Sequence, residues 1–184
     1  FGVALRALEL GLELPDQAVY DAFYRSLDPG WLAAYHATFY EIRDRLRTAE
    51  TARWLALNDD YPPFTAFLHR AAGRRAIAIL TARDGASLDA VLDQLGVAAI
   101  IPRQLRLDKE TGIHKTSHLT ELADRLQVQF PEISFVDDKV NHLERVAPLG
   151  VRPVLAGWGL NTPREHERAK ALGFPVARLD DLDS

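Results

Sequence analysis

The sequence contains no cysteine and no methionine among its 184 residues. Without cysteine the chain has no disulfide, no thiolate nucleophile and no cysteine-based zinc site, which is compatible with the cytoplasm, where we expect the protein. Basic residues are not in excess, since 22 Lys and Arg stand against 26 Asp and Glu, and the net charge of −4 argues against nonspecific nucleic-acid binding. No apolar run reaches membrane-spanning length, so we expect no membrane partner.

The composition is that of a globular protein, with 47% apolar and 26% charged residues. A chain of this length can bury a substantial core in one domain, or in one domain with a small insertion. Arg6 and Glu9 interrupt the first apolar segment, so we expect no signal peptide there.

The chain changes character near residue 74. Residues 1–73 show apolar positions at helical spacing throughout, and we expect an all-helical region. Residues 74–184 alternate short apolar runs with amphipathic helices, which predicts an α/β domain with a Rossmann-like parallel sheet and helices on both faces. Residues 102–114 are polar, with Gly112 as a turn, and no strand is expected there. The expected strands cover residues 76–80, 97–101, 133–136, 151–155 and 175–177.

Two adjacent carboxylates, Asp137 and Asp138, follow the apolar run 133–136 directly. In an open parallel sheet, ligands bind beyond the carboxyl ends of the strands. Adjacent acids repel each other unless a cation or a proton lies between them, and Mg²⁺ needs only one or two protein carboxylates. A second interpretation is also open, in which one of the acids only caps the following helix.

Two further polar residues stand at element ends. Thr81 follows the apolar run 76–80. Lys115 stands at the start of the amphipathic helix that follows the polar residues 102–114. Thr81 could instead only cap its own turn. Lys115 could instead be a solvated lysine at the start of a helix, and Lys109 is a second candidate for the functional lysine. His114 and His118 are four residues apart and could share a helix face as zinc ligands.

The order of these signals resembles the haloacid dehalogenase-like hydrolase superfamily. Ile79-Leu80-Thr81 is similar to its second motif, an apolar strand ending in Thr or Ser. Lys115 is similar to the third, and Phe135-Val136-Asp137-Asp138 to the fourth, with Asn141 near a further acid position. The turn Ala156-Gly157-Trp158-Gly159 also resembles that of family members.

The resemblance implies a haloacid dehalogenase-like core over residues 74–184 and a helical cap over residues 1–73. It implies Mg²⁺-dependent hydrolysis of a small phosphorylated substrate through an aspartyl-phosphate. Asp137 and Asp138 would hold the Mg²⁺, and Thr81 and Lys115 would bind phosphate. Arg83 and Asn141 would assist in substrate binding at the rim. Two alternatives are another reaction on this scaffold, such as dehalogenation or phosphomutation, and a catalytically silent binding or regulatory domain.

The first motif of that superfamily has no counterpart in the sequence. Its nucleophile is an Asp at the end of the first strand, with a second Asp two residues later, and none of the apolar strands expected here is followed by Asp-x-Asp. In the superfamily this strand lies in the centre of the sheet, between the strands that 76–80 and 133–136 resemble. We therefore expect an N-terminal segment of about 15 to 30 residues that carries the strand and the nucleophile.

Overall fold

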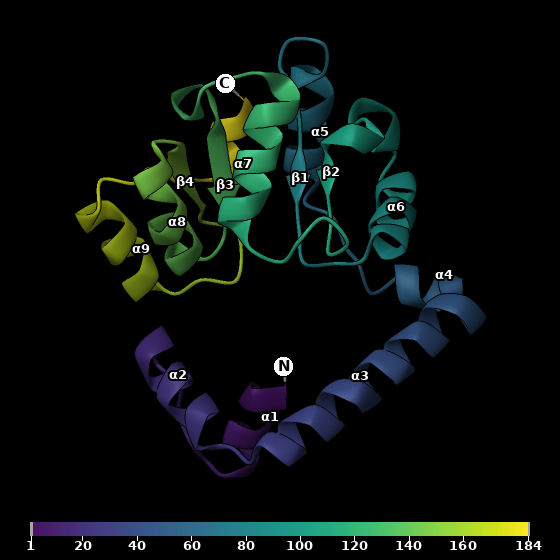
Figure 1. The fold of residues 1–184 in the computed structure, drawn as a ribbon, viewed down its shortest axis with the longest axis vertical. Coiled ribbons are helices and arrows are strands. Elements are labelled where there is room, and N and C mark those ends of the chain that lie inside the picture. The colour runs from purple at the N-terminus through teal and green to yellow at the C-terminus, as the bar shows by residue number, and fades with distance from the viewer. Residues whose placement is uncertain (1, 184) are drawn as a thin grey trace. The chain divides into compact units, whose positions relative to one another are not determined.

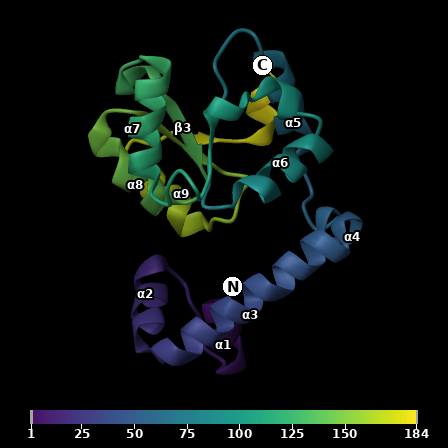
Figure 2. The same ribbon diagram turned by 45° about the vertical axis from the view of Figure 1, so that its right-hand side comes forward.

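Residues 2–183 are described by the computed structural model, and the chain divides into two units, Phe1–Leu57 and Asn58–Ser184. None of the helices described is long and apolar enough to cross a membrane. Figures 1 and 2 show the elements of both units.

The first unit is helical, as predicted. Two aspartates fix where its longer helices begin, because each accepts a hydrogen bond from a backbone N–H of the first turn. Asp16 Oδ1 accepts from Val19 at 2.9 Å, and Asp28 Oδ2 accepts from Trp31 at 2.6 Å. Within this unit α1 contacts both α2 and α3 (Figure 1). The helices are α1 (Gly2–Glu9), α2 (Gln17–Ser26), α3 (Pro29–Ala49) and α4 (Thr51–Leu55).

The second unit alternates strands and helices. Its helices are α5 (Pro62–Ala71), α6 (Gly85–Gln94), α7 (Lys115–Leu126), α8 (Val140–Val146) and α9 (Pro163–Ala171). Its strands are β1 (Ile79–Leu80), β2 (Arg106–Leu107), β3 (Ser134–Asp137), β4 (Arg152–Ala156) and β5 (Val176–Ala177). Short 3₁₀ turns are η1 (Ala98–Ile100), η2 (Arg103–Leu105), η3 (Phe130–Glu132), η4 (Ala147–Leu149) and η5 (Leu179–Asp183).

All strand pairs in the described residues are parallel, which confirms the predicted α/β class. The strands form two sheets, one with the order β1-β2 and the other with the order β3-β4-β5. In the larger sheet Asp137 of β3 stands opposite Leu155 of β4. In Figure 1 helix α7 passes beside the space between β3 and β1. The sequence predicted a single sheet, whereas the structure has two separate sheets, each made of parallel strands.

The core of the larger sheet is made by β3 and β4 against the helices on their faces. Phe135, Leu155, Leu119 and Leu143 are buried there in one apolar cluster. Helix α5, which the sequence analysis grouped with the N-terminal helices, belongs to the second unit and contacts the C-terminal turn η5 (Figure 2).

Two predictions about the segment after α6 are wrong. Residues 97–101 form no strand but the turn η1, in which the Ile100 N–H donates to the Val97 oxygen at 3.1 Å. Val97 and Ile101 are almost fully buried against α6, and a short buried apolar run does not distinguish a strand from a turn. The strand β2 lies instead within the polar residues 102–114, where no strand was expected.

Candidate functional site

Lys115 connects the carboxyl ends of β1 and β3, which belong to separate sheets. It is the first residue of α7, and its Nζ donates a hydrogen bond to the backbone oxygen of Leu80 at the end of β1. The same Nζ lies 3.9 Å from Oδ2 of Asp137 at the end of β3, and the two side chains are only 18% and 10% exposed. Two of the residues predicted for the site are thus brought together.

Two donors contact the Asp137 carboxylate, beside the Lys115 ammonium. Its Oδ1 accepts hydrogen bonds from the backbone N–H of Lys139 at 2.9 Å and from His142 Nδ1 at 3.0 Å. Burial by itself would raise the pKa of Asp137, but the hydrogen bonds from His142 and Lys139 and the charges of His142 and Lys115 outweigh it. The pKa of Asp137 therefore lies below its usual value, and the group is an anion at neutral pH.

The Lys115 ammonium is partly removed from water. This burial lowers the pKa of Lys115, and the charges of Asp137 and Asp138 only partly oppose the shift. A desolvated ammonium interacts more strongly with an anion than a hydrated one does, because the local dielectric constant is lower. Lys115 is thereby suited to contact an anionic ligand at the ends of β1 and β3.

Asp138 is held by a different part of the chain from Asp137. Its Oδ2 accepts the backbone N–H of Leu160 at 2.9 Å, in the turn that follows β4. The pair thus offers carboxylate oxygens from two neighbouring residues, which is a donor set that fits Mg²⁺ with water and substrate oxygens completing its shell. Within residues 2–183 no cluster of three or more His, Asp or Glu is placed to hold a metal ion.

Thr81 and Arg83 form the turn at the end of β1. The Thr81 N–H donates to the Leu107 oxygen at 2.8 Å, and its Oγ1 accepts from the Arg83 N–H at 3.1 Å. Thr81 therefore does cap its own turn, yet its hydroxyl proton remains able to donate to an anion. The Arg83 guanidinium donates to Asn58 Oδ1 at 2.9 Å.

Four other residues that the sequence singled out are placed differently. Lys109 has an exposed side chain, and its backbone N–H donates to the Arg83 oxygen at 3.0 Å. Asn141 lies on α8, but the contact to the Asp137 carboxylate comes from the next residue, His142. The zinc interpretation of His114 and His118 is not supported, because the His118 ring is 1% exposed and its Nε2 bonds to the Gly112 oxygen at 2.9 Å.

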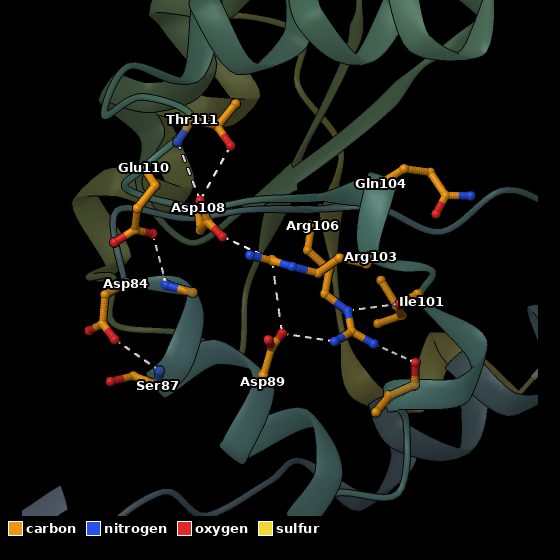
Figure 3. A network of polar contacts seen from close by, with 12 residues as sticks. Asp84, Ser87, Asp89, Ile101, Arg103, Gln104, Arg106, Asp108, Glu110 and Thr111 are labelled. Carbon is orange, nitrogen blue, oxygen red and sulfur yellow. Dashed lines mark hydrogen bonds and ion pairs between the residues drawn. The ribbon is translucent and has the colours of Figure 1, made fainter.

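A network of charged side chains fixes the segment that leads from β2 to α7 (Figure 3). The Arg103 guanidinium contacts the buried carboxylate of Asp108 at 2.9 Å, and Thr111 donates to the same carboxylate. Arg106 donates to Asp89 of α6 at 2.8 Å. Burial would raise the pKa of Asp108, but the hydrogen bonds from Arg103 and Thr111 lower it overall. These contacts anchor the loop from which α7, and with it Lys115, begins.

A groove separates β1 from β3. It has a volume of about 800 Å³ and is lined by β1, β3, α7 and α5, including Leu80, Val136, Leu122 and Phe67. Val136 is 45% exposed, although its neighbours on β3 are the buried Phe135 and the half-buried Asp137. Asp137 also lines the groove, at the end where Lys115 spans from β3 to β1. The groove is largely apolar along the strands, with Asp137 at their carboxyl ends and Arg75, Glu132 and Arg152 near their amino ends.

The sequence analysis missed His142, Asn161 and His166. Asn161 Nδ2 donates to the backbone oxygen of Asp138 at 3.2 Å, and His166 Nε2 contacts Asn161 Oδ1 at 2.5 Å. His142 follows the candidate Asn141 directly, in the first turn of α8. Its position shortly after Asp137 was a signal from which its contact to that carboxylate could have been predicted. Asn161 and His166 carry no sequence signal, because their partners lie on other elements.

Comparisons with known proteins agree with this geometry at the level of fold. No family model matches the chain, and no curated protein matches it. Among solved structures, it is similar to a haloacid dehalogenase-like family hydrolase from Streptococcus pneumoniae, with a TM-score of 0.66 and 13% identity over 96% of this chain and 83% of the other. The chain therefore has the haloacid dehalogenase-like α/β fold, as the sequence motifs predicted.

Proposed function

We propose that this protein is a Mg²⁺-dependent phosphomonoester hydrolase that acts on a small phosphorylated substrate through an aspartyl-phosphate. The observation that carries the proposal is the position of Lys115, whose Nζ reaches both the end of β1 and the Asp137 carboxylate at the end of β3. Phosphoryl transfer depends mainly on positioning and on neutralising charge. A desolvated ammonium beside an ionised carboxylate supplies both at one edge of the sheet.

The residues of the site take distinct roles in this proposal. Asp137 and Asp138 would hold the Mg²⁺, which when bound supplies positive charge between the anionic substrate and an anionic nucleophile. Lys115 binds a phosphoryl oxygen and orients it toward the end of β3. The Thr81 hydroxyl donates to a second phosphoryl oxygen, while Arg83 lies at the rim. The helices of residues 1–57 serve as the cap that selects the substrate.

The groove between β1 and β3 supports a place for the nucleophile. Its walls are strands of parallel sheets, so a strand that entered parallel to both would end where Lys115 and Asp137 lie. Apolar side chains of that strand would contact Leu80, Val136 and Leu122. An Asp at its carboxyl end would then face Lys115. In this proposal the nucleophile belongs to a segment outside residues 1–184.

The proposal is tested with the protein as its gene encodes it. We expect hydrolysis of p-nitrophenyl phosphate that requires Mg²⁺ and is lost with EDTA. Lys115→Ala should lower kcat/KM by about 10²–10³-fold, as loss of a group that stabilises transition-state charge does. Lys109→Ala is the matched control and should leave the rate near that of the parent.

Three outcomes would overturn all or part of the proposal. Hydrolysis of p-nitrophenyl phosphate that persists in EDTA would remove Mg²⁺ from the proposal, and turnover of a haloacid without a divalent cation, in the absence of any phosphatase activity, would favour dehalogenation on this scaffold. A complete lack of turnover with Mg²⁺ present, across a panel of phosphomonoesters, would favour a catalytically silent binding domain.

A further inference from the structure

A second polar cluster lies behind Asp138, where the turn after β4 leads into α9. The side-chain amide of Asn161 donates to two backbone oxygens, that of Asp138 at 3.2 Å and that of Ala156 at 2.8 Å. Its Oδ1 contacts His166 Nε2 at 2.5 Å. One side chain therefore joins the end of β3, the end of β4 and the helix α9.

The chemistry of these partners fixes the orientation of the Asn161 amide. Backbone oxygens only accept hydrogen bonds, so the group that faces Asp138 and Ala156 must be the NH₂. The carbonyl of Asn161 then faces His166, whose Nε2 must carry a proton to donate to it. The His166 Nε2–H then satisfies the Asn161 carbonyl, which stabilises the amide in the orientation that donates to Asp138.

The turn also approaches Asp138 so closely that only glycine fits at position 159. A Cβ on Gly159 would lie 2.2 Å from the Asp138 Cβ. The next residue, Leu160, donates its N–H to Asp138 Oδ2 at 2.9 Å, while its oxygen accepts from Lys139 Nζ. Both the backbone and the carboxylate of Asp138 are therefore held by this turn.

We infer that Asn161 is a positioning residue for Asp138, and that His166 keeps Asn161 in the orientation this requires. The inference rests on the proposed function, in which Asp138 is a ligand of the divalent cation. Asn161 holds the Asp138 backbone while Leu160 holds one carboxylate oxygen, so the direction of the carboxylate is set before a cation binds. Neither residue touches the substrate.

The fold of α9 offers a control that separates positioning from stability. Thr162 caps this helix by accepting from the Glu165 N–H, and Glu165 accepts in return from the Thr162 N–H. Thr162→Ala removes a helix cap next to Asn161 without removing any hydrogen bond to Asp138. It should destabilise α9 and leave cation binding unchanged.

The experiment measures Mn²⁺ binding to the encoded protein by electron paramagnetic resonance, without substrate, together with the urea unfolding midpoint. Asp138→Asn should weaken binding and thereby validates the assay. Asn161→Leu and His166→Leu should each weaken it about 10–100-fold, as loss of groups that orient ligands does. His166→Gln, which keeps a donor near the Nε2 position, should keep affinity within about threefold of the parent, clearly less than the loss expected for His166→Leu. Thr162→Ala should lower the midpoint only.

The outcomes separate this inference from the proposed function. If Asp138→Asn weakens Mn²⁺ binding but Asn161→Leu and both His166 variants do not, Asn161 is not a positioning residue and the inference is wrong. If affinity follows the unfolding midpoint across all variants, including Thr162→Ala, the role is structural and the inference is also wrong. If the parent does not bind Mn²⁺, the metal part of the proposed function fails, and the inference fails with it.

Discussion

The pair formed by Lys115 and Asp137 gives a quantitative test of the site that needs no substrate. Two unit charges at their separation of 3.9 Å attract each other by about 4 kcal/mol at an effective dielectric constant of about 20. Part of this is offset because the ammonium has left water, so we expect a net coupling free energy of about 1–3 kcal/mol. Both side chains are at most 18% exposed, so screening by solvent is limited.

A double-mutant cycle measures this coupling. Lys115→Met keeps the aliphatic stem and removes the charge, while Asp137→Asn keeps an oxygen that can accept from His142 and Lys139. Each single variant leaves one buried charge without its partner, so the double variant should lose less stability than the sum of the two. The matched control is the pair of Arg125 and Glu121 on the same helix, which is 31% and 48% exposed and should couple by only about 0.3–0.5 kcal/mol.

The assay is urea unfolding followed by the fluorescence of Trp158. The protein has three tryptophans, and the other two, Trp31 and Trp54, lie in the first unit, so a background with both changed to Phe reports on the second unit alone. Trp158 lies 5.6 Å from the Phe64 ring, an arrangement that unfolding would abolish. A coupling below about 0.5 kcal/mol would refute the reasoning, because independent sites are additive to that degree.

Two further predictions concern stability. Because the pKa of Asp137 is lowered in the folded state, its contribution is present above the unfolded pKa of about 3.9 and is lost as pH falls through the folded pKa. In urea titrations, the stability difference between the parent and Asp137→Asn should therefore stay constant from about pH 7 to about pH 5 and shrink as the pH falls further. Growth of the difference on acidification would contradict this. Leu155 of β4 is fully buried, so Leu155→Ala should cost about 2–5 kcal/mol of unfolding free energy by chemical denaturation, whereas Leu160→Ala, at a side chain 75% exposed, should stay within about 0.5 kcal/mol of the parent.

The sequence predicted the larger sheet well and the smaller one poorly. The run before Asp137 forms β3 because large apolar residues next to turn residues have few alternatives to a buried strand. The run 97–101 is also apolar, yet it forms a turn, in which the Val97 N–H donates back to Leu92 of α6 and the Ile100 N–H donates to the Val97 oxygen. Arg106 in β2 gave no strand signal, because its burial depends on a partner, Asp89, on another element.

The candidate site shows the same division between local and long-range information. Thr81, Lys115 and Asp137 were found because each stands at the end of an element, where local pattern and chemistry coincide. The choice of Lys115 over Lys109 required the loop from β2 to α7, whose path is set by Arg103 and Asp108. Contacts between distant segments, such as Asn161 with Asp138, leave no trace in local spacing.

The groove between β1 and β3 also bears on solubility. Each of these strands is hydrogen-bonded to one neighbouring strand within the described residues, and Val136 presents an exposed apolar side chain on β3. An open strand edge of this kind is a template on which another chain can add a strand. Two such edges in one molecule permit edge-to-edge association of several chains. Any form of the protein in which the groove is unfilled should therefore self-associate as its concentration rises, and occupancy of the groove would protect it from aggregation.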